Sequence, residues 1–397
     1  MRVPIGDFKL GVEEKVAINE VLDSGRISEG KKVKQFEDEW AEYVGTKYCV
    51  LTNSGTTALM AGLSCLDYTK HKSSKKEILT TPITYIATSN AVVLSGLKPV
   101  YVDVDINNFG ITTENVKIYF EENPNNDIKA IMPVHLMGFP VDMDGINRIA
   151  KEHGVLTIED SAQAHGSYYN GKRTGSHSLL SFFSFYIAHN IQAGEMGAVN
   201  TDDPEIRDYV NKIKANGRMC DCRICSRPKG FCVKGDIGVD PRFSHDIIGG
   251  NYKVMEFQAA LGLVQLKRVN DILKQRQDNV KYLNEGLQEF SNILQLPPYS
   301  TDISYLAYPM VIKDLKINRE RLRLMLEKEG VETRPLFGSI PTQQPAYSHL
   351  KEKYQGKLHN ADYLGLNAFY IGCHQYLNQE QLDYIISSFK KVLGEYK

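Results

Sequence analysis

The chain has 397 residues, of which 42% are hydrophobic, and its 47 basic residues nearly balance its 48 acidic ones. A chain of this length can bury a full core and suggests more than one domain. A net charge of −1 gives no basic surplus for binding nucleic acid or an anionic membrane. No apolar signal core opens the sequence, and no run reaches the roughly 18 apolar residues of a membrane span. We therefore expect a soluble, cytoplasmic protein.

The N-terminal half alternates helical and strand-like segments. Residues 13–25 and 31–45 carry apolar side chains at helical spacing, and each segment ends in a glycine that can stop a helix. Seven strand-like runs follow, most of them separated by helical patterns, at 48–55, 77–84, 98–105, 129–138, 155–162, 178–185 and 197–202. This alternation predicts crossover connections around a mainly parallel, buried sheet.

The pattern changes after about residue 250. Residues 255–287 have the spacing of one long helix, followed by a strand-like run at 304–312 and helical patterns at 319–330 and 379–393. This is an α+β pattern. We therefore predict a large α/β domain over residues 1–250 and a smaller C-terminal α+β domain, with the long helix, over residues 251–397.

Ser54, Gly55 and Thr56 come directly after a predicted strand and open a predicted helix. Free backbone N–H groups and the helix dipole at such a position favour a phosphate. An ordinary N-cap and turn would give the same pattern.

Asp160 ends another predicted strand, at the edge where open α/β sheets bind their ligands. A carboxylate there could pair with a protonated pyridine nitrogen and keep the ring an electron sink. A helix cap is the simpler interpretation of the same residue.

Four of the seven cysteines fall within thirteen residues, in a loop at about 218–234. They are Cys220, Cys222, Cys225 and Cys232. Disulfides are rare in a reducing cytosol, so the cluster indicates a metal site. The spacing differs from that of zinc fingers and ribbons, and Arg223, Arg227 and Lys229 could offset the negative charge of an iron–sulfur cluster. Structural zinc remains the alternative.

Nine segments in one order resemble the DegT/DnrJ/EryC1/StrS sugar aminotransferase family of fold type I pyridoxal-phosphate enzymes, over essentially the full length. They are SGRISEG, TNSGTTAL, TPITYIAT, YVDVDINNFGI, IEDSAQAHG, SFFSFYIAHNIQAGEMGAV, NYKVMEFQAALG, TRPLF and YIGCHQYL. The resemblance implies the fold type I architecture, in which the large domain binds the cofactor.

The resemblance also implies a binding role for particular residues. Gly55 and Thr56, just after Ser54, would hold the cofactor phosphate together with the hydroxyl of Ser184. Asn251 would reach the phosphate of the neighbouring subunit, because the family's active sites form at a homodimer interface. The residue before Asn251 is a glycine, whereas the family usually has an aromatic residue there.

Three further residues would surround the cofactor ring by the same resemblance. Tyr85 would stack on the pyridine, Asp160 would pair with its nitrogen, and Gln163 would lie beside its 3-hydroxyl. Arg334, in TRPLF, could meet the diphosphate of a sugar nucleotide or form a salt bridge between domains.

His189 departs from the family pattern, because a family aminotransferase needs a lysine directly before the position of Asn190. Imidazole cannot bind the coenzyme covalently as that amine does. The cofactor would then be held without a covalent bond, as pyridoxamine phosphate, and His189 could move a proton near neutral pH. A silent or introduced substitution is the alternative.

His189 and the cysteine spacing together resemble one branch of the family, the CDP-6-deoxy-4-hexulose 3-dehydrase-like enzymes. That resemblance implies pyridoxamine phosphate, a [2Fe-2S] cluster and removal of the C3 hydroxyl from a nucleotide-linked 4-keto-6-deoxyhexose. Electrons would come from a flavin and iron–sulfur NAD(P)H reductase. The alternatives are a related dehydratase without an electron relay, whose cysteine loop would be structural or bind zinc, and a non-catalytic metal or redox protein.

Overall fold

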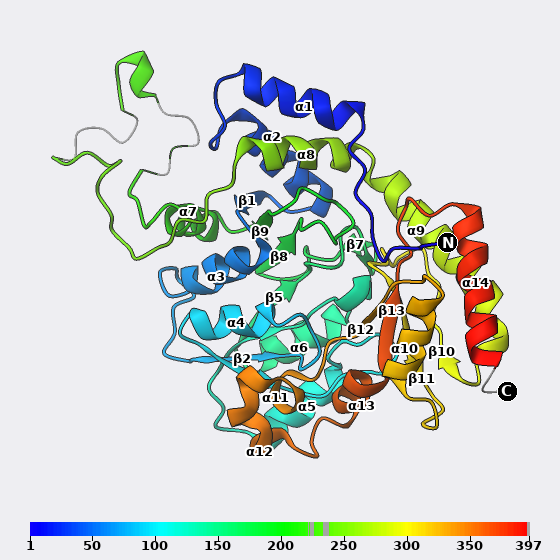
Figure 1. Ribbon diagram of the computed structural model, residues 1–397. Helices are drawn as coiled ribbons and strands as arrows, with labels where there is room; N and C mark the ends of the chain where they lie inside the picture. Colours follow the sequence, from blue (N-terminus) through cyan, green and yellow to red (C-terminus); the bar gives the residue numbers. More distant parts are fainter. Residues whose placement is uncertain (221, 223–225, 233–237, 395–397) are drawn as a thin grey trace.

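A seven-stranded sheet runs through the middle of the molecule in the computed structural model (Figure 1). The structure describes residues 1–220, 222, 226–232 and 238–394. The sheet order is β1-β9-β8-β5-β4-β2-β3. The strands are β1 (Tyr48–Thr52), β2 (Glu77–Thr80), β3 (Lys98–Tyr101), β4 (Ile128–Met132), β5 (Leu156–Asp160), β8 (Leu180–Ser184) and β9 (Gly197–Thr201).

Most strand pairs of this sheet are parallel, as the sequence predicts. Strand β2 pairs in parallel with β3 and β4, β4 with β5, and β5 with β8, whereas β9 runs antiparallel to both of its neighbours. The carboxyl ends of β1, β2, β4, β5 and β8 therefore lie at one edge, and the candidate site residues follow these ends.

Helices cover both faces of the sheet because neighbouring side chains of a strand point to opposite faces. Phe182 packs into a cluster with α3, α4 and α7, whereas Phe183 packs into a cluster with α2 and α8 (Glu256–Lys267). The helices of this part are α2 (Lys31–Val44), α3 (Gly55–Cys65), α4 (Ala87–Leu94), α5 (Thr113–Glu122), α6 (Met143–Glu152) and α7 (Pro204–Ile213).

A smaller antiparallel sheet, in the order β10-β11-β13-β12, forms the C-terminal part with the helices around it. Its strands are β10 (Leu294–Gln295), β11 (Tyr308–Ile312), β12 (Thr333–Pro335) and β13 (Ala368–Ile371). The helices are α10 (Arg319–Lys328), α11 (Ile340–Gln343), α12 (Lys351–Tyr354), α13 (His359–Asn367) and α14 (Gln379–Leu393). Elsewhere β6 (Tyr168–Tyr169) and β7 (Lys172–Arg173) form a short hairpin.

The predicted single helix over residues 255–287 is two helices, α8 (Glu256–Lys267) and α9 (Val269–Leu287). The break falls at Arg268, whose φ of −104° and ψ of 8° leave the helical range, and whose guanidinium pairs with Glu14 of α1 (Val12–Asp23). Helix α8 packs on α1 and α2, and α9 packs on α14. The domain boundary at residue 250 stays a prediction. No helix in the described part of the chain is long and apolar enough to cross a bilayer.

Glu256, the first residue of α8, caps the N-terminus of α2 from far along the chain. Its buried carboxylate accepts backbone N–H groups of Gly30 at 2.7 Å, Val33 at 2.9 Å and Lys32 at 2.9 Å. A helix N-terminus leaves such N–H groups unpaired, and its dipole favours a negative charge. Glu256 thus does the work of an N-cap side chain, which Gly30 lacks.

We expect Glu256→Gln to lower the free energy of unfolding by about 1 to 3 kcal/mol, because it removes the charge from buried hydrogen bonds. Urea unfolding of the purified protein measures the change. Glu152→Gln, at an exposed residue of α6, is the matched control and should alter stability by less than about 0.5 kcal/mol. Equal stability of both variants would contradict the capping role.

Candidate functional site

The N-terminus of α3 and the end of β8 form one continuous surface. Ser54 is the N-cap of α3 and accepts the N–H of Thr57 at 3.2 Å. A Cβ atom on Gly55 would lie 2.6 Å from Cβ and 2.9 Å from Oγ of Ser184. Only glycine lets this serine hydroxyl approach the first turn of the helix so closely. The structure thus brings together Ser54, Gly55, Thr56 and Ser184, which the family resemblance predicts to form a phosphate cup; phosphate binding there stays a prediction.

Asp160 lies buried at the end of β5, the strand that pairs with β8. Its Oδ2 accepts the hydroxyl of Thr88 at 2.8 Å, and its Oδ1 accepts the N–H of Ala162 at 3.2 Å. Burial raises the pKa of Asp160, and these two hydrogen bonds offset part of the rise. Among the described residues no cation forms an ion pair with it. A buried carboxylate of this kind is suited to a cationic partner such as a pyridinium.

Gln163 and Tyr85 flank the same edge of the sheet. Oε1 of Gln163 accepts the N–H of Met137 at 2.9 Å, which fixes the buried side chain and leaves its amide nitrogen as the donor. Tyr85 follows β2, and its side chain is 60% exposed. Its ring meets Phe337 edge to face at 5.9 Å between centroids. An exposed aromatic ring here is available to stack on a bound ligand.

His189 lies in the loop between β8 and β9, and its imidazole is half-buried. Its Nδ1 is buried and has no hydrogen-bond partner in the described part of the chain. Burial and the charge of Arg276 lower the pKa of His189 to about 4. The imidazole is therefore neutral at pH 7 and can accept a proton.

Asn251 is exposed, and its Oδ1 accepts Nζ of Lys253 at 2.7 Å. Its backbone carbonyl accepts the amide of Asn53, and the N–H of Asn53 bonds the carbonyl of Tyr252 at 2.8 Å. The chain at 251–252 is thus tied to the residue before the phosphate cup. A Cβ on Gly250 would lie 2.4 Å from the ring of Tyr252, so a side chain at position 250 would displace that ring.

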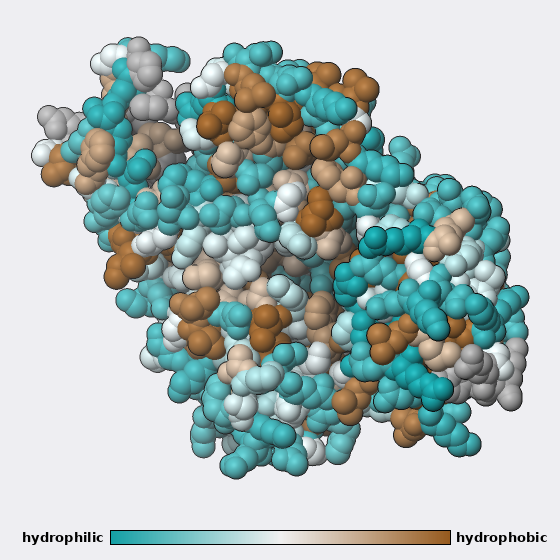
Figure 2. All heavy atoms as spheres, in the orientation of Figure 1, coloured by the Kyte–Doolittle hydropathy of each residue, from teal (hydrophilic) through white to brown (hydrophobic). Residues whose placement is uncertain are grey.

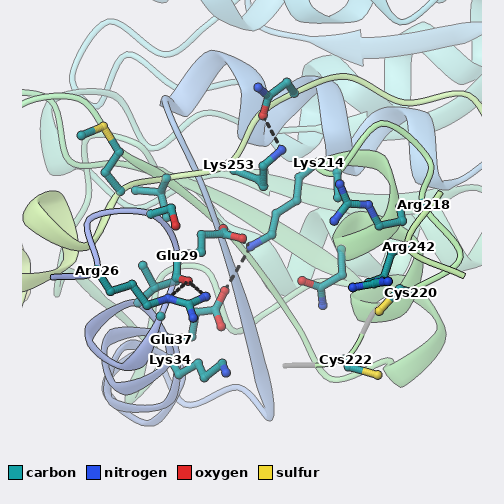
Figure 3. A pocket seen from close by; sticks show the side chains of 18 residues that line it. Arg26, Glu29, Lys34, Glu37, Lys214, Arg218, Cys220, Cys222, Arg242 and Lys253 are labelled. Atoms are coloured by element: carbon teal, nitrogen blue, oxygen red, sulfur yellow. Dashed lines mark hydrogen bonds and ion pairs between the residues drawn. The ribbon is translucent and has the colours of Figure 1, made fainter. Parts of the chain in front are cut away.

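A pocket of about 550 Å³ lies beside this segment, between the N-terminus of α2 and the loop after α7 (Figure 3). Cys220 and Cys222 line one wall, and Asn251 also lines the pocket. Lys214 reaches from the interior to Glu29 at 2.8 Å and Glu37 at 3.5 Å. Burial lowers the pKa of the Lys214 amine, but these two glutamates outweigh it and the net shift is upward, so this amine is engaged by two carboxylates.

The predicted thiol cluster is only partly within the described residues. Cys225 and Arg223 lie outside them, and Cys232 does not line the pocket that holds Cys220 and Cys222. Among the described residues no three histidine, cysteine or carboxylate side chains gather as a metal site. Arg227, expected to offset cluster charge, pairs with Asp240 at 3.2 Å.

Arg334 is not joined to His189 or Asp160 by any described contact. Its guanidinium donates to Glu332 at 2.5 Å and to the carbonyl of Thr333, within the same strand segment. The predicted salt bridge is therefore local rather than between domains. A role in binding a diphosphate stays a prediction.

The sequence did not reveal two residues that border the site, Thr88 and His165. Thr88 holds Asp160, and the ring of His165 lies 5.8 Å from that of His189. Both belong to segments that match the family, TPITYIAT and IEDSAQAHG. The two segments could have been recognised from their match to the family. Only the folded chain shows which residue of each segment lies at the site.

The described residues fit a phosphorylated pyridine cofactor. The start of α3 with Ser184 offers donors for a phosphate, and Asp160 offers a buried carboxylate that lacks a cation. His189 stands at the position of the family's lysine, so the cofactor would be held there without a covalent bond. The set matches the resemblance to pyridoxal-phosphate enzymes.

Comparison with known proteins agrees with this geometry. The chain is 31% identical over 406 residues to the lipopolysaccharide biosynthesis protein RfbH of Salmonella typhimurium, covering 99% of this chain and 92% of that protein. It is also 31% identical over 401 residues to the dTDP-4-dehydro-2,6-dideoxy-D-glucose 3-dehydratase of Saccharopolyspora spinosa, covering 97% and 85%.

Among solved structures, the Escherichia coli GDP-4-keto-6-deoxy-D-mannose 3-dehydratase with bound hydrated PLP superimposes with a TM-score of 0.86. The two are 28% identical, and the match covers 97% of this chain and 98% of the other. The fold type I architecture is thus confirmed. Residues 9–390 match a single family profile, and this chain belongs to the DegT/DnrJ/EryC1/StrS aminotransferase family.

Proposed function

We propose that this protein is a pyridoxamine-phosphate-dependent enzyme that removes the C3 hydroxyl of a nucleotide-linked 4-keto-6-deoxyhexose. The observation that carries the proposal is an intact cradle for a phosphorylated pyridine in which a neutral histidine, His189, replaces the lysine of the family. The similarity to two 3-dehydratases of sugar nucleotides supports the reaction and the substrate class.

Each residue of the site would have a separate role. Pyridoxamine phosphate would supply a primary amine that can condense with the 4-keto group and a ring that takes up electron density. Gly55, Thr56 and Ser184 hold the phosphate, and Asp160 keeps the ring nitrogen protonated. Because Nδ1 of His189 is buried, Nε2 is the atom left to exchange a proton with the substrate.

We also propose that Cys220, Cys222, Cys225 and Cys232 hold a [2Fe-2S] cluster that receives electrons from a flavin and iron–sulfur NAD(P)H reductase. Loss of the C3 hydroxyl as water, with two electrons and two protons taken up, would give a 3,6-dideoxy-4-ketohexose. Two observations support a relay: the Cys-x-Cys-x2-Cys-x6-Cys spacing, and the pocket that places Cys220 and Cys222 beside Asn251, next to the phosphate cup.

A dehydratase without an electron relay is the second candidate. It is favoured by the described thiols, which do not gather into a ligand set. In that enzyme the cysteine loop would be structural or bind zinc, and an amino donor such as glutamate would restore the cofactor amine.

We propose that the active protein is a homodimer in which Asn251 reaches the phosphate of the partner. The exposure of Asn251 supports this, as do exposed apolar residues of the nearby loop, of which Phe243 is 78% and Ile248 is 86% exposed. Figure 2 also shows apolar atoms gathered over α1, where Val12 is 78% exposed. Apolar surface of this kind marks an interaction face.

Gly55→Ala should weaken binding of pyridoxamine phosphate by about 10- to 100-fold, because the added Cβ displaces Ser184 from the phosphate. Equilibrium dialysis measures the affinity without any substrate. Gly6→Ala is the control, since a Cβ there meets nothing within 4 Å. Unchanged affinity in Gly55→Ala would show that the phosphate binds elsewhere.

His189→Lys should bind pyridoxal phosphate covalently, because the new amine occupies the family position. Borohydride reduction and mass spectrometry should then find the cofactor on the introduced lysine, whereas His189→Asn should retain no covalent cofactor. Both variants should dehydrate the sugar at least about 100-fold more slowly than the natural protein. Dehydration at the full rate in His189→Asn would exclude His189 as the proton carrier.

The electron relay predicts iron and acid-labile sulfide in protein purified without oxygen, with the electron paramagnetic resonance signal of a reduced [2Fe-2S] cluster. Cys222→Ser should lose this signal and the reduction step but keep its affinity for pyridoxamine phosphate. Cys49→Ser, at a buried thiol outside the loop, should retain the signal. A colourless protein containing zinc after anaerobic reconstitution would favour the second candidate.

A further inference from the structure

Arg276 is a buried cation without a carboxylate partner among the described residues. It lies on α9 and is 2% exposed. Its Nε donates to Oε1 of Gln375 at 3.0 Å, and its Nη1 donates to the carbonyls of Tyr305 at 3.1 Å and Leu306 at 2.9 Å. Buried arginines are rarely left unpaired, because an uncompensated buried charge is destabilising. A functional role for Arg276 would account for that cost.

The carbonyls that Arg276 holds belong to a segment that also holds the histidine loop. Asn190, directly after His189, donates its Nδ2 to the carbonyl of Ser304 at 2.8 Å. Three consecutive carbonyls, 304 to 306, therefore accept hydrogen bonds from the loop on one side and from α9 on the other. Tyr305 has a φ of +43°, and its hydroxyl is fixed between the N–H of Ser300 at 2.8 Å and the carbonyl of Pro298 at 2.7 Å.

The surroundings of His189 contain few other charges. Its ring lies 5.8 Å from that of His165 and 6.4 Å from that of Tyr186. Burial lowers the pKa of His165 well below its usual value, so this ring is neutral too. Arg276 has Cys373 and His374 beside it, and burial raises the pKa of that thiol and lowers the pKa of that imidazole, so both are neutral. Within the described residues, Arg276 is thus the cation that acts on His189, together with burial.

We propose that Arg276 is a positioning residue for His189: it holds the 304–306 segment against the histidine loop, and it sets a buried positive charge without a carboxylate partner among the described residues in the surroundings of the imidazole. This inference rests on the proposed function for its purpose, since an aminotransferase lysine would need no such control of an imidazole. The electrostatic effect itself does not depend on the reaction. It can be measured in the protein without cofactor or substrate.

The structure offers a nearly isosteric way to neutralise Arg276. Nε2 of Gln375 is buried and has no hydrogen-bond partner among the residues that the structure describes, while Oε1 accepts the guanidinium. Gln375→Glu therefore keeps the hydrogen bond, loses none, and places a negative charge against Arg276. Because that charge offsets the cation, the protonated form of His189 becomes less unfavourable, and its pKa rises.

The test is a pH titration of the histidine rings by NMR in full-length, cofactor-free protein labelled on the imidazole carbons. The signal that vanishes in His189→Asn identifies His189 among the 10 histidines. In the natural protein its midpoint should lie well below 6.5, and in Gln375→Glu it should be higher by about one pH unit. Gln355→Glu, which adds the same charge at an exposed residue after α12, should leave the midpoint unchanged.

Two arginine variants separate charge from packing. Arg276→Lys retains the cation and should keep the low midpoint, whereas Arg276→Gln should raise it as Gln375→Glu does. A midpoint near 6.5 in the natural protein, or equal midpoints in the natural protein and a folded charge-neutralising variant, would overturn the inference. If the shifts occur but no sugar is dehydrated, the proposed function fails and this inference stands.

Discussion

The contact between the first turn of α3 and the end of β8 is the constraint on which the site depends. Because Gly55 has no side chain, Ser184 lies against the helix N-terminus, and the loop that carries His189 starts from that serine. Asp160 pairs with Phe182 of the neighbouring strand β8. Its carboxylate therefore lies at the same edge of the sheet as Ser184, one strand away from it. The backbone thus brings Gly55, Ser184 and Asp160 to one edge of the sheet, and side-chain contacts such as that of Asn190 with Ser304 fix the loop that carries His189.

A histidine at the lysine position changes what the surroundings must provide. A lysine binds its cofactor covalently, whereas an imidazole must be aligned by packing and kept unprotonated by its environment. Burial and the charge of the buried Arg276 guanidinium both disfavour a positive charge on His189. The substitution is therefore accompanied by surroundings suited to a neutral base.

The sequence predicted the helix and strand order well, because buried parallel strands and amphipathic helices leave clear periodicities. It predicted that Ser54 lies between a strand and a helix and that Asp160 ends a strand, and both lie there; Ser184 was assigned only through the family resemblance. Element ends were less accurate: β2 stops at Thr80, just before Pro82, although the apolar run continues to Thr84. The partners of the site, such as Thr88 and Gln375, are set by contacts between distant segments, and no local pattern carries that information.

The cap of α2 has a consequence for synthesis of the chain. Glu256 follows Gly30 by 226 residues, so a ribosome has made well over half of the protein before this carboxylate exists. Until then the first turn of α2 keeps exposed donors, and the strand β9, which closes onto β1, is also made late. Contacts of such high sequence separation form slowly. The N-terminal segments therefore stay without their later partners while the chain is bound to the ribosome. Chaperone binding in this period would protect their exposed apolar surface from aggregation.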